Sequence, residues 1–359
     1  MDLPLSLNSS GIDYWKDNRL FQKVLNHGYS QMDWEKTSDE FLLYLFLHDE
    51  PTLGKIRSEK TKKAYFRDLS DFLSFAKEYK GVKNLHPDDL KKYQYIMEET
   101  GYAPTTLRRK TAVIKQFMRY LLQIGAINQD NTFLMKRTSI NKDQLVNRDL
   151  YEHEVRQLLN YFKTNDYFAY TLLFILVSTG LRISELASAR WADLFYYPEQ
   201  DRFFITVTGK RNKERIAVIF KDVLRVIQEF RKRRGHESEL SEDNPTAFFP
   251  KADGSHYNSA YLSHEFSRLI LNTHEIFPFI KRRKILHEQG NKRYNITPHT
   301  CRHYTAAYFA EQGVNLKAIQ DMLGHESITT TESYLRRKRR LEEHAGVQVD
   351  NLFLNLLLN

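Results

Sequence analysis

The sequence predicts a mainly α-helical protein with a small antiparallel β-sheet, an α+β fold in two domains. Its 359 residues are about twice the length of a typical domain. Hydrophobic residues make up 41% and aromatic residues 13%, enough to build packed cores. Helical periodicity fills the first part of the chain, whereas the second part adds one pair of β-rich segments. The longest clean apolar run, Leu172–Val177, is far shorter than the roughly 20 residues that cross a bilayer.

The first domain, residues 36–130, is predicted to be entirely helical. Residues 1–35 precede it and show no sustained period, so we expect an arm or one short extra helix. Thr37 and Glu40 have the spacing of a capping box, which predicts a helix start before an apolar run. Four helices are expected: one through Phe41–Leu47, then Ser58–Tyr79, Pro87 to Gly101, and Pro104 to Gly125.

The fourth of these helices has a basic face. At 100° per residue, Arg108, Lys115 and Arg119 lie within about 40° of one another, and Arg109 adjoins them. Residues 101–142 hold eight Lys or Arg and one acidic residue. A solvated face normally mixes signs and so gains i,i+4 pairs, and this one does not. We therefore expect the four cations to contact phosphate groups; the alternative is an ordinary solvated face.

The second domain, residues 148–341, follows a polar linker over 131–147 and has a mixed pattern. Two β-rich runs, Phe203–Thr208 and Arg215–Phe220, predict a hairpin. Helices are expected at Tyr151–Phe162, Asp166–Ser178, Lys221–Arg234, Ser259–Leu271, His299–Gln312, Leu316–Leu323 and about Ser327–Arg340.

Charge and cysteine usage restrict the function classes. The chain has 54 Lys and Arg against 45 Asp and Glu, a net charge of +9 that favours an anionic partner without identifying it. A single cysteine, Cys301, excludes a disulfide framework and a multi-cysteine zinc cluster. Residues 1–11 contain no Lys or Arg and do not resemble a secretion leader, so we expect a cytoplasmic protein.

Two candidate site segments lie near the middle of the chain. An apolar helix ends at Gly180 and another begins at once, with Arg182 at the junction and Glu185 one turn later. Helix N-terminal amides beside an arginine suit a phosphate; the alternative is an ion pair between Arg182 and Glu185. Lys210 opens the hairpin turn, where a lysine is usually a surface residue that improves solubility.

Two more segments lie toward the end of the chain. His299, Arg302 and His303 have i,i+3 and i,i+4 spacing and can share one helix face. An arginine in that group would repel a metal cation, and no HExxH motif occurs, so we expect neither a metal nor another cofactor. His325 follows a glycine, and Tyr334 lies nine residues further on.

These residues form a cation-rich set with one candidate nucleophile. A tyrosine hydroxyl attacks only when a cationic site lowers its pKa or a base takes its proton. Arginine, lysine and histidine together stabilise the additional negative charge of a five-coordinate phosphate. The sequence shows no carboxylate pair for two-metal hydrolysis and no Gly-rich phosphate loop. The set predicts chemistry on a phosphodiester.

Four segments in order resemble the signature motifs of the tyrosine recombinase (phage integrase) family. They are STGLRISELASARWADL (178–194), TGKRNKER (208–215), HTCRH (299–303) and MLGHESITTTESY (322–334). Residues 36–130 are similar in architecture to the helical, SAM-like core-binding domain of that family. The resemblance implies two domains that form a clamp around DNA.

The resemblance also implies a role for each candidate. Arg182 and Arg302 would hold the non-bridging oxygens of the scissile phosphate. His299 and His325 would hydrogen-bond the same phosphate, with His299 also a candidate base. Tyr334 would attack phosphorus and form a 3′-phosphotyrosyl link.

The remaining candidates are assigned supporting roles by the same resemblance. Lys210 would be the general acid for the leaving 5′ oxygen, with Lys213 as a weaker contender. Glu185 would orient the neighbouring basic residues. His303 has either a packing role or a direct contact. Cys301 departs from the residue usual in the family but removes no reactive group, so we expect an active enzyme.

The resemblance implies double-stranded DNA with specific sites as the partner. The protein would act as a homotetramer on this DNA, in a reaction that passes through a Holliday junction, and accessory proteins are an option. The protein would be associated with the nucleoid when bound to DNA. The tail, residues 342–359, ends in an apolar segment that would be a liability in water. We expect it to dock on a neighbouring subunit; the alternative is that it folds back on its own domain.

Two rival functions are a catalytically silent DNA-binding regulator with this fold and a type IB topoisomerase-like enzyme.

Overall fold

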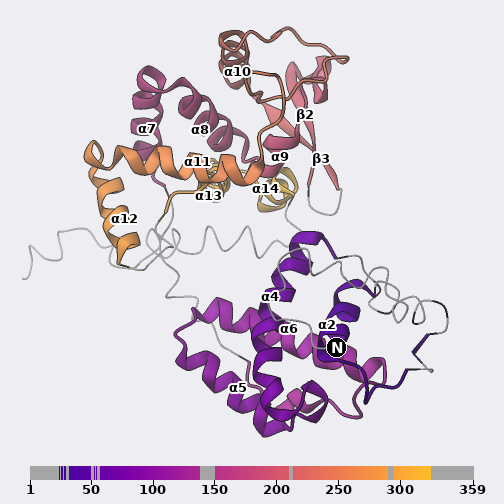
Figure 1. Cartoon of the computed structure of the whole chain (residues 1–359). Helices are drawn as coiled ribbons and strands as arrows, with labels where there is room; N and C mark the ends of the chain where they lie inside the picture. The colour runs from indigo at the N-terminus through magenta and orange to yellow at the C-terminus, as the bar shows by residue number, and fades with distance from the viewer. Residues whose placement is uncertain are drawn as a thin grey trace, which may run out of the picture. The chain divides into compact units, whose positions relative to one another are not determined.

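The structure is a computed structural model in which the chain divides into two compact units, Met1–Leu145 and Val146–Asn359. Figure 1 shows the helices and strands of both units. The residues that the structure describes are a few positions between 24 and 31, then 32–49, 52, 54, 57–137, 150–209, 213–289 and 295–324. Most of the predicted arm, the predicted helix 327–340 and the tail 342–359 lie outside them.

The first unit is a helical bundle around one apolar core. The helices are α2 (Asp39–His48), α4 (Glu59–Ala76), α5 (Pro87–Glu99) and α6 (Pro104–Gln123). Every residue of α2 from Phe41 to Leu47 is at most 3% exposed, and α4 and α6 pack against this helix. Its cap is Ser38, whose hydroxyl accepts a hydrogen bond from the Phe41 amide, so the cap lies one residue later than the spacing of Thr37 predicts.

The first unit continues beyond residue 130. Residues Asn131–Leu134 form a short 3-10 helix, η5, that packs on α5. The Asn131 side chain donates to the Leu85 carbonyl at 2.7 Å, and Met135 joins the core at 2% exposure. The first part of the segment predicted as a linker is therefore fixed to the bundle, while residues 138–149 lie outside the described part of the chain.

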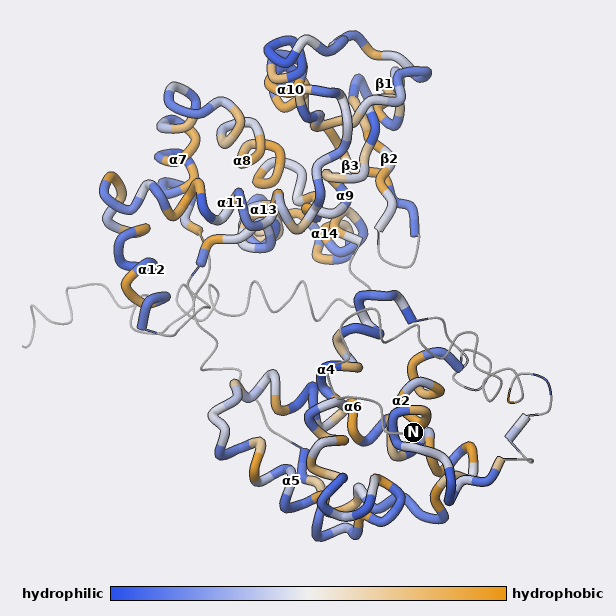
Figure 2. Tube along the Cα trace, in the orientation of Figure 1, coloured by the Kyte–Doolittle hydropathy of each residue, from blue (hydrophilic) through white to orange (hydrophobic). Residues whose placement is uncertain are grey.

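The second unit is built around α8, the most hydrophobic of its helices (Figure 2). Helices α7, α10, α11 and α13 pack against it. The helices of this unit are α7 (Glu152–Asn165), α8 (Tyr167–Thr179), α9 (Ile183–Ser188), α10 (Lys221–Arg233), α11 (Ser259–Leu271), α12 (Pro278–Glu288), α13 (Pro298–Glu311) and α14 (Leu316–Leu323). Sequence periodicity predicts all of them except α9, expected only as a helix start, and α12.

A three-stranded antiparallel sheet lies beside these helices. Strands β2 (Arg202–Thr208) and β3 (Glu214–Ile219) form the predicted hairpin, in a register that pairs Thr208 with Glu214. A third strand, β1 (Leu194–Tyr197), pairs with β2 and is not predicted from the sequence. No helix in the described parts of the chain is long and apolar enough to span a membrane.

Candidate active site

The site begins where α8 gives way to α9. Gly180 ends α8 in the left-handed conformation, with φ +62°. A Cβ at this position would lie 2.7 Å from the Leu323 side chain, so the glycine is needed both for its dihedral angle and for the close approach of α14. The turn places Arg182 at the N-cap of α9, where Glu185 accepts its backbone N–H at 2.7 Å. That amide is therefore already paired within the protein.

Glu185 is a buried carboxylate shared by two arginines. Its side chain is 0% exposed. It accepts from Arg182 Nη1 at 2.6 Å, and from Arg215 Nη2 at 2.7 Å and Nε at 3.3 Å. Burial by itself raises the pKa of Glu185, but the hydrogen bonds and charges of Arg215 and Arg182 outweigh it and hold the pKa below its ordinary value. Glu185 is therefore an anion that fixes two guanidinium groups.

Three arginines donate to the carboxyl end of α14. The last carbonyl groups of this helix and its cap, residues 322–324, accept in order from Arg215, Arg302 and Arg182. The first of these distances is 2.5 Å and the last is 2.9 Å. Carbonyl groups at a helix C-terminus lack intrahelical donors and carry partial negative charge, so they are natural acceptors for cations.

Helix α13 carries the remaining predicted residues described here. Arg302 is only 1% exposed and also donates from Nη1 to the Gly180 carbonyl at 2.6 Å. His299 and His303 lie one turn apart with their rings perpendicular and 4.6 Å between centroids, as their i,i+4 spacing predicts. His299 is exposed and His303 is partly buried. Figure 1 shows α13 and α14 close together in the second unit, where α14 also packs against β3.

The segments leading to two further predicted residues both start beside Arg182. A Cβ on Gly209, which precedes Lys210, would lie 3.4 Å from Glu185 Oε1 and 3.8 Å from Arg182 Nη1. Gly324, which precedes the second predicted segment, accepts from Arg182 Nη2. Lys210, His325 and Tyr334 themselves lie outside the described residues.

The structure thus brings Arg182, Glu185 and Arg302 together around α14. It adds Arg215, which sequence reasoning assigned only to a β-rich run. A signal was available, because Arg215 has the same parity in β3 as the buried residues Ala217 and Ile219 and must face inward. An inward-facing arginine requires an anionic or carbonyl partner.

The four predicted phosphate-contacting residues of α6 have different surroundings. Arg108 and Arg119 are exposed, and neither has an ion-pair partner within the described residues. Arg109 pairs with Asp68, which is 1% exposed. Lys115 donates to the Met135 carbonyl at 2.7 Å. Only the first two combine exposure with an unengaged charge.

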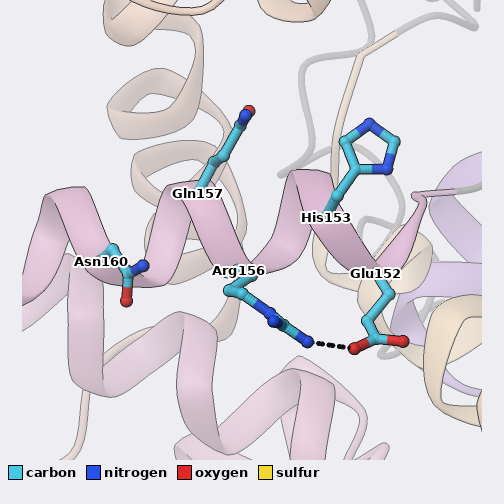
Figure 3. Close-up of a pocket in the computed structure, with 5 residues that line it drawn as sticks. All are labelled: Glu152, His153, Arg156, Gln157 and Asn160. Carbon is cyan, nitrogen blue, oxygen red and sulfur yellow. Dashed lines mark hydrogen bonds and ion pairs between the residues drawn. The ribbon is translucent and has the colours of Figure 1, made fainter.

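A shallow cavity of about 520 Å³ lies elsewhere in the second unit. It is lined by α7 alone, and its Arg156 and Glu152 are already paired at 2.5 Å (Figure 3). None of the predicted site residues lines it, so we place the site at the arginine cluster instead. The residues that the structure describes contain no group of three or more His, Cys, Asp or Glu arranged to hold a metal ion.

Comparison with known proteins identifies the family. Residues 148–340, more than half of the chain, match the sequence profile of the phage integrase family. The chain belongs to the phage integrase family. Residues 38–125 also match the N-terminal SAM-like domain of phage integrases, which agrees with the all-helical first unit.

Relatives and solved structures of this family cover most of the chain. A tyrosine recombinase XerD of Listeria monocytogenes is 28% identical over 80% of this chain and 91% of its own length. A tyrosine recombinase of Thermosipho africanus is 27% identical over 77% and 89%. The XerH site-specific recombinase bound to a palindromic difH substrate is 18% identical and covers 97% of this chain and 99% of its own, with a TM-score of 0.64. The Tn1549 transposon integrase in complex with transposon right-end DNA is 20% identical, covers 85% and 99%, and has a TM-score of 0.56.

Proposed function

We propose that this phage integrase family member is a site-specific tyrosine recombinase that cleaves and rejoins double-stranded DNA through a 3′-phosphotyrosyl intermediate. The observation that carries the proposal is the arginine cluster at α14. It holds Arg182 and Arg302 within one network, and the segments leading to Lys210 and His325 start beside it. The family match over 148–340 supplies the reaction class.

The first half of the reaction is an attack of Tyr334 on phosphorus. The tyrosine oxygen forms a bond to the scissile phosphate while its proton passes to a base, for which His299 is the candidate. Arg182 and Arg302 hold the non-bridging oxygens, and His299 and His325 donate hydrogen bonds to them. These groups stabilise the negative charge that grows on five-coordinate phosphorus.

The second half is the departure of the 5′ oxygen. The bond between phosphorus and this oxygen breaks, and Lys210 supplies the proton that makes it a hydroxyl group. A 5′ hydroxyl from a partner strand then attacks the phosphotyrosyl link in the reverse reaction. Because the link conserves the free energy of the phosphodiester, the exchange needs no separate energy source.

Arg302 sets a structural condition on this mechanism. Its guanidinium is 1% exposed and donates to the carbonyls of Gly180 and Leu323. A phosphate oxygen can reach this buried group only if part of the chain that covers it moves. We therefore propose that the carboxyl end of α14 shifts when the scissile phosphate enters.

The partners follow from the same proposal. The XerH and Tn1549 structures contain these recombinases bound to DNA, and we propose a DNA duplex with specific sites as the substrate here. Strand exchange through a Holliday junction requires four active sites, so we propose a homotetramer on two DNA sites, with nucleoid association while bound. The tail, residues 342–359, would dock on a neighbouring subunit through its apolar end, residues 351–359.

The test uses nicked duplexes that trap a covalent intermediate. Oligonucleotides are tiled from the DNA that flanks the gene, and those bound most tightly are prepared with a nick next to each candidate position. The wild-type protein should form complexes that survive boiling in detergent. Tyr334→Phe should bind the same DNA with unchanged affinity and form none, since it lacks the attacking oxygen. Covalent complexes with this variant would overturn the choice of nucleophile.

The same experiment separates the rival functions. A silent DNA-binding regulator would bind the tiled DNA and never form a covalent complex. A topoisomerase-like enzyme would relax supercoiled plasmids regardless of sequence, whereas the proposed recombinase joins strands only between its own sites.

A further inference from the structure

Arg215 is a nearly buried cation that connects three parts of the second unit. Its side chain is 11% exposed and projects inward from β3, the strand that follows the Lys210 turn. Two of its nitrogens donate to the Glu185 carboxylate of α9, and a third donates to the Met322 carbonyl at the end of α14. One guanidinium thus joins β3, α9 and α14.

The contacts on either side of Arg215 lead directly to the candidate site. Glu185 uses its remaining acceptor capacity on Arg182, so the position of the Arg182 guanidinium depends on where Arg215 holds the carboxylate. The aliphatic part of the Arg215 side chain also packs against Gly324. A Cβ added to Gly324 would lie 2.8 Å from the Cδ of Arg215. The segment containing His325 begins at that point.

The guanidinium is well suited to this position and an ammonium is not. A guanidinium carries a rigid fork of five N–H donors, and here it spans a carboxylate on one side and a carbonyl on another. A lysine could compensate the charge of Glu185 but could not make both connections with fixed geometry. In this structure all three nitrogens of the Arg215 guanidinium donate to protein acceptors, so its described hydrogen bonds lie within the protein.

We propose that Arg215 is a positioning residue for the strand-exchange reaction. It acts through Glu185 on Arg182 and through Met322 on the end of α14, and so sets β3, Arg182 and the end of α14 relative to one another. This inference rests on the proposed recombinase function. It predicts that loss of Arg215 damages the chemical step and leaves DNA affinity intact.

The experiment measures single-turnover cleavage of the nicked substrate at saturating protein. Arg215→Ala and Arg215→Lys should each lower the cleavage rate about 10- to 100-fold, the range expected when reacting groups are displaced by about 1 Å. Their Kd for the same duplex should stay within about twofold of the wild type. Arg225→Ala is the matched control, because Arg225 is an exposed arginine of the same unit, paired with Asp222 at 2.9 Å. It should cleave at the wild-type rate.

A second substrate separates positioning from general damage. A methylphosphonate at the scissile position has no negative charge, so it depends less on the Arg182 guanidinium. The penalty of Arg215→Ala should shrink on this substrate, and the penalty of Arg182→Ala should shrink with it. Urea unfolding of each variant identifies any that fail to fold, and Arg215→Lys keeps the charge if the alanine variant does fail.

The outcomes are distinguishable. If the wild-type protein forms no covalent complex on any tiled DNA, the proposed function fails and this inference falls with it. If the wild type cleaves and both Arg215 variants cleave at the wild-type rate, the recombinase function stands and the positioning role is wrong. An equal penalty on both substrates would also overturn it, because Arg215 would then not act through Arg182.

Discussion

The basic face of α6 permits a quantitative prediction about DNA binding. Arg108 and Arg119 are exposed and unpaired within the described part of the chain, whereas Arg109 and Lys115 are engaged with Asp68 and a backbone carbonyl. We therefore expect the double substitution of Arg108 and Arg119 by alanine to remove two phosphate contacts. Substitution of the other two should remove charge without removing such contacts.

The expected magnitude follows from counterion release. Each phosphate contact contributes about 0.9 to the slope of log K against log salt concentration, so two contacts contribute about 1.8. Between 50 and 200 mM salt, the binding of the Arg108 and Arg119 double variant should then weaken about twelvefold less than that of the wild type.

The assay is fluorescence anisotropy with a labelled duplex of unrelated sequence, titrated at several salt concentrations. The matched control is the alanine double variant of Arg109 and Lys115. These residues lie on the same helix, and their substitution removes the same net charge. This control variant should retain most of the wild-type slope and instead lose stability in urea, because Asp68 is left without its arginine partner. An unchanged slope in the Arg108 and Arg119 variant, or an equal reduction in the control, would refute the assignment.

Three further predictions concern the second unit. Lys210→Ala should lower the cleavage rate strongly and change the Kd for DNA little. A substrate with a 5′-thio leaving group, which needs no proton, should restore the cleavage rate of this variant. If the rate is not restored, Lys210 is not the general acid. Gly180→Ala should lower the free energy of unfolding by about 1–3 kcal/mol more than Gly235→Ala does. Both glycines have positive φ, but only a Cβ at Gly180 would collide with the Leu323 side chain. Equal losses of stability in urea unfolding would contradict this prediction. The pKa of Glu185 is lower in the folded protein than in the unfolded chain, so its ionised form stabilises the fold. This stabilisation is complete above the ordinary glutamate pKa of about 4.3 and is lost as the pH falls through the pKa of the folded state. The stability difference between wild type and Glu185→Gln should therefore shrink below about pH 4, and a difference independent of pH would contradict it.

Local signals explain why much of the fold is predictable from sequence. Helix α6 begins at Pro104 and presents an apolar stripe that the structure buries, with Ile114 and Leu121 at 0% exposure. The β2–β3 hairpin is visible as two β-rich runs around a turn that begins at Gly209. In these elements the sequence period, the caps and the tertiary packing agree.

The elements that were missed depend on tertiary contacts. Helix α12 buries only Ile280 and is rich in basic residues, so no apolar period marks it. Strand β1 has four residues, of which Leu194 alone is buried, and it exists because β2 offers a free edge. Ser38 caps α2 in place of Thr37, since neighbouring hydroxyl residues give the same local signal.

The candidate site was partly predictable for the same reason. The i,i+3 spacing of Arg182 and Glu185 indicates their pairing, which the structure contains. The contacts of Arg302 with carbonyl groups of α8 and α14 join residues up to 122 positions apart, and no local pattern reports them. Main-chain acceptors have no signature in the sequence, so the strand parity of Arg215 indicates that it faces inward but does not identify the carbonyl that it contacts.

The use of main-chain carbonyls at the end of α14 determines which mutations this family member can accumulate. The acceptors at residues 322–324 belong to the backbone, so exchange of the Met322 side chain leaves all three in place. A one-residue insertion or deletion within α14 would rotate the helix end by about 100° and move every acceptor at once. The site should therefore tolerate drift in amino-acid identity along this helix and be intolerant of changes in its length.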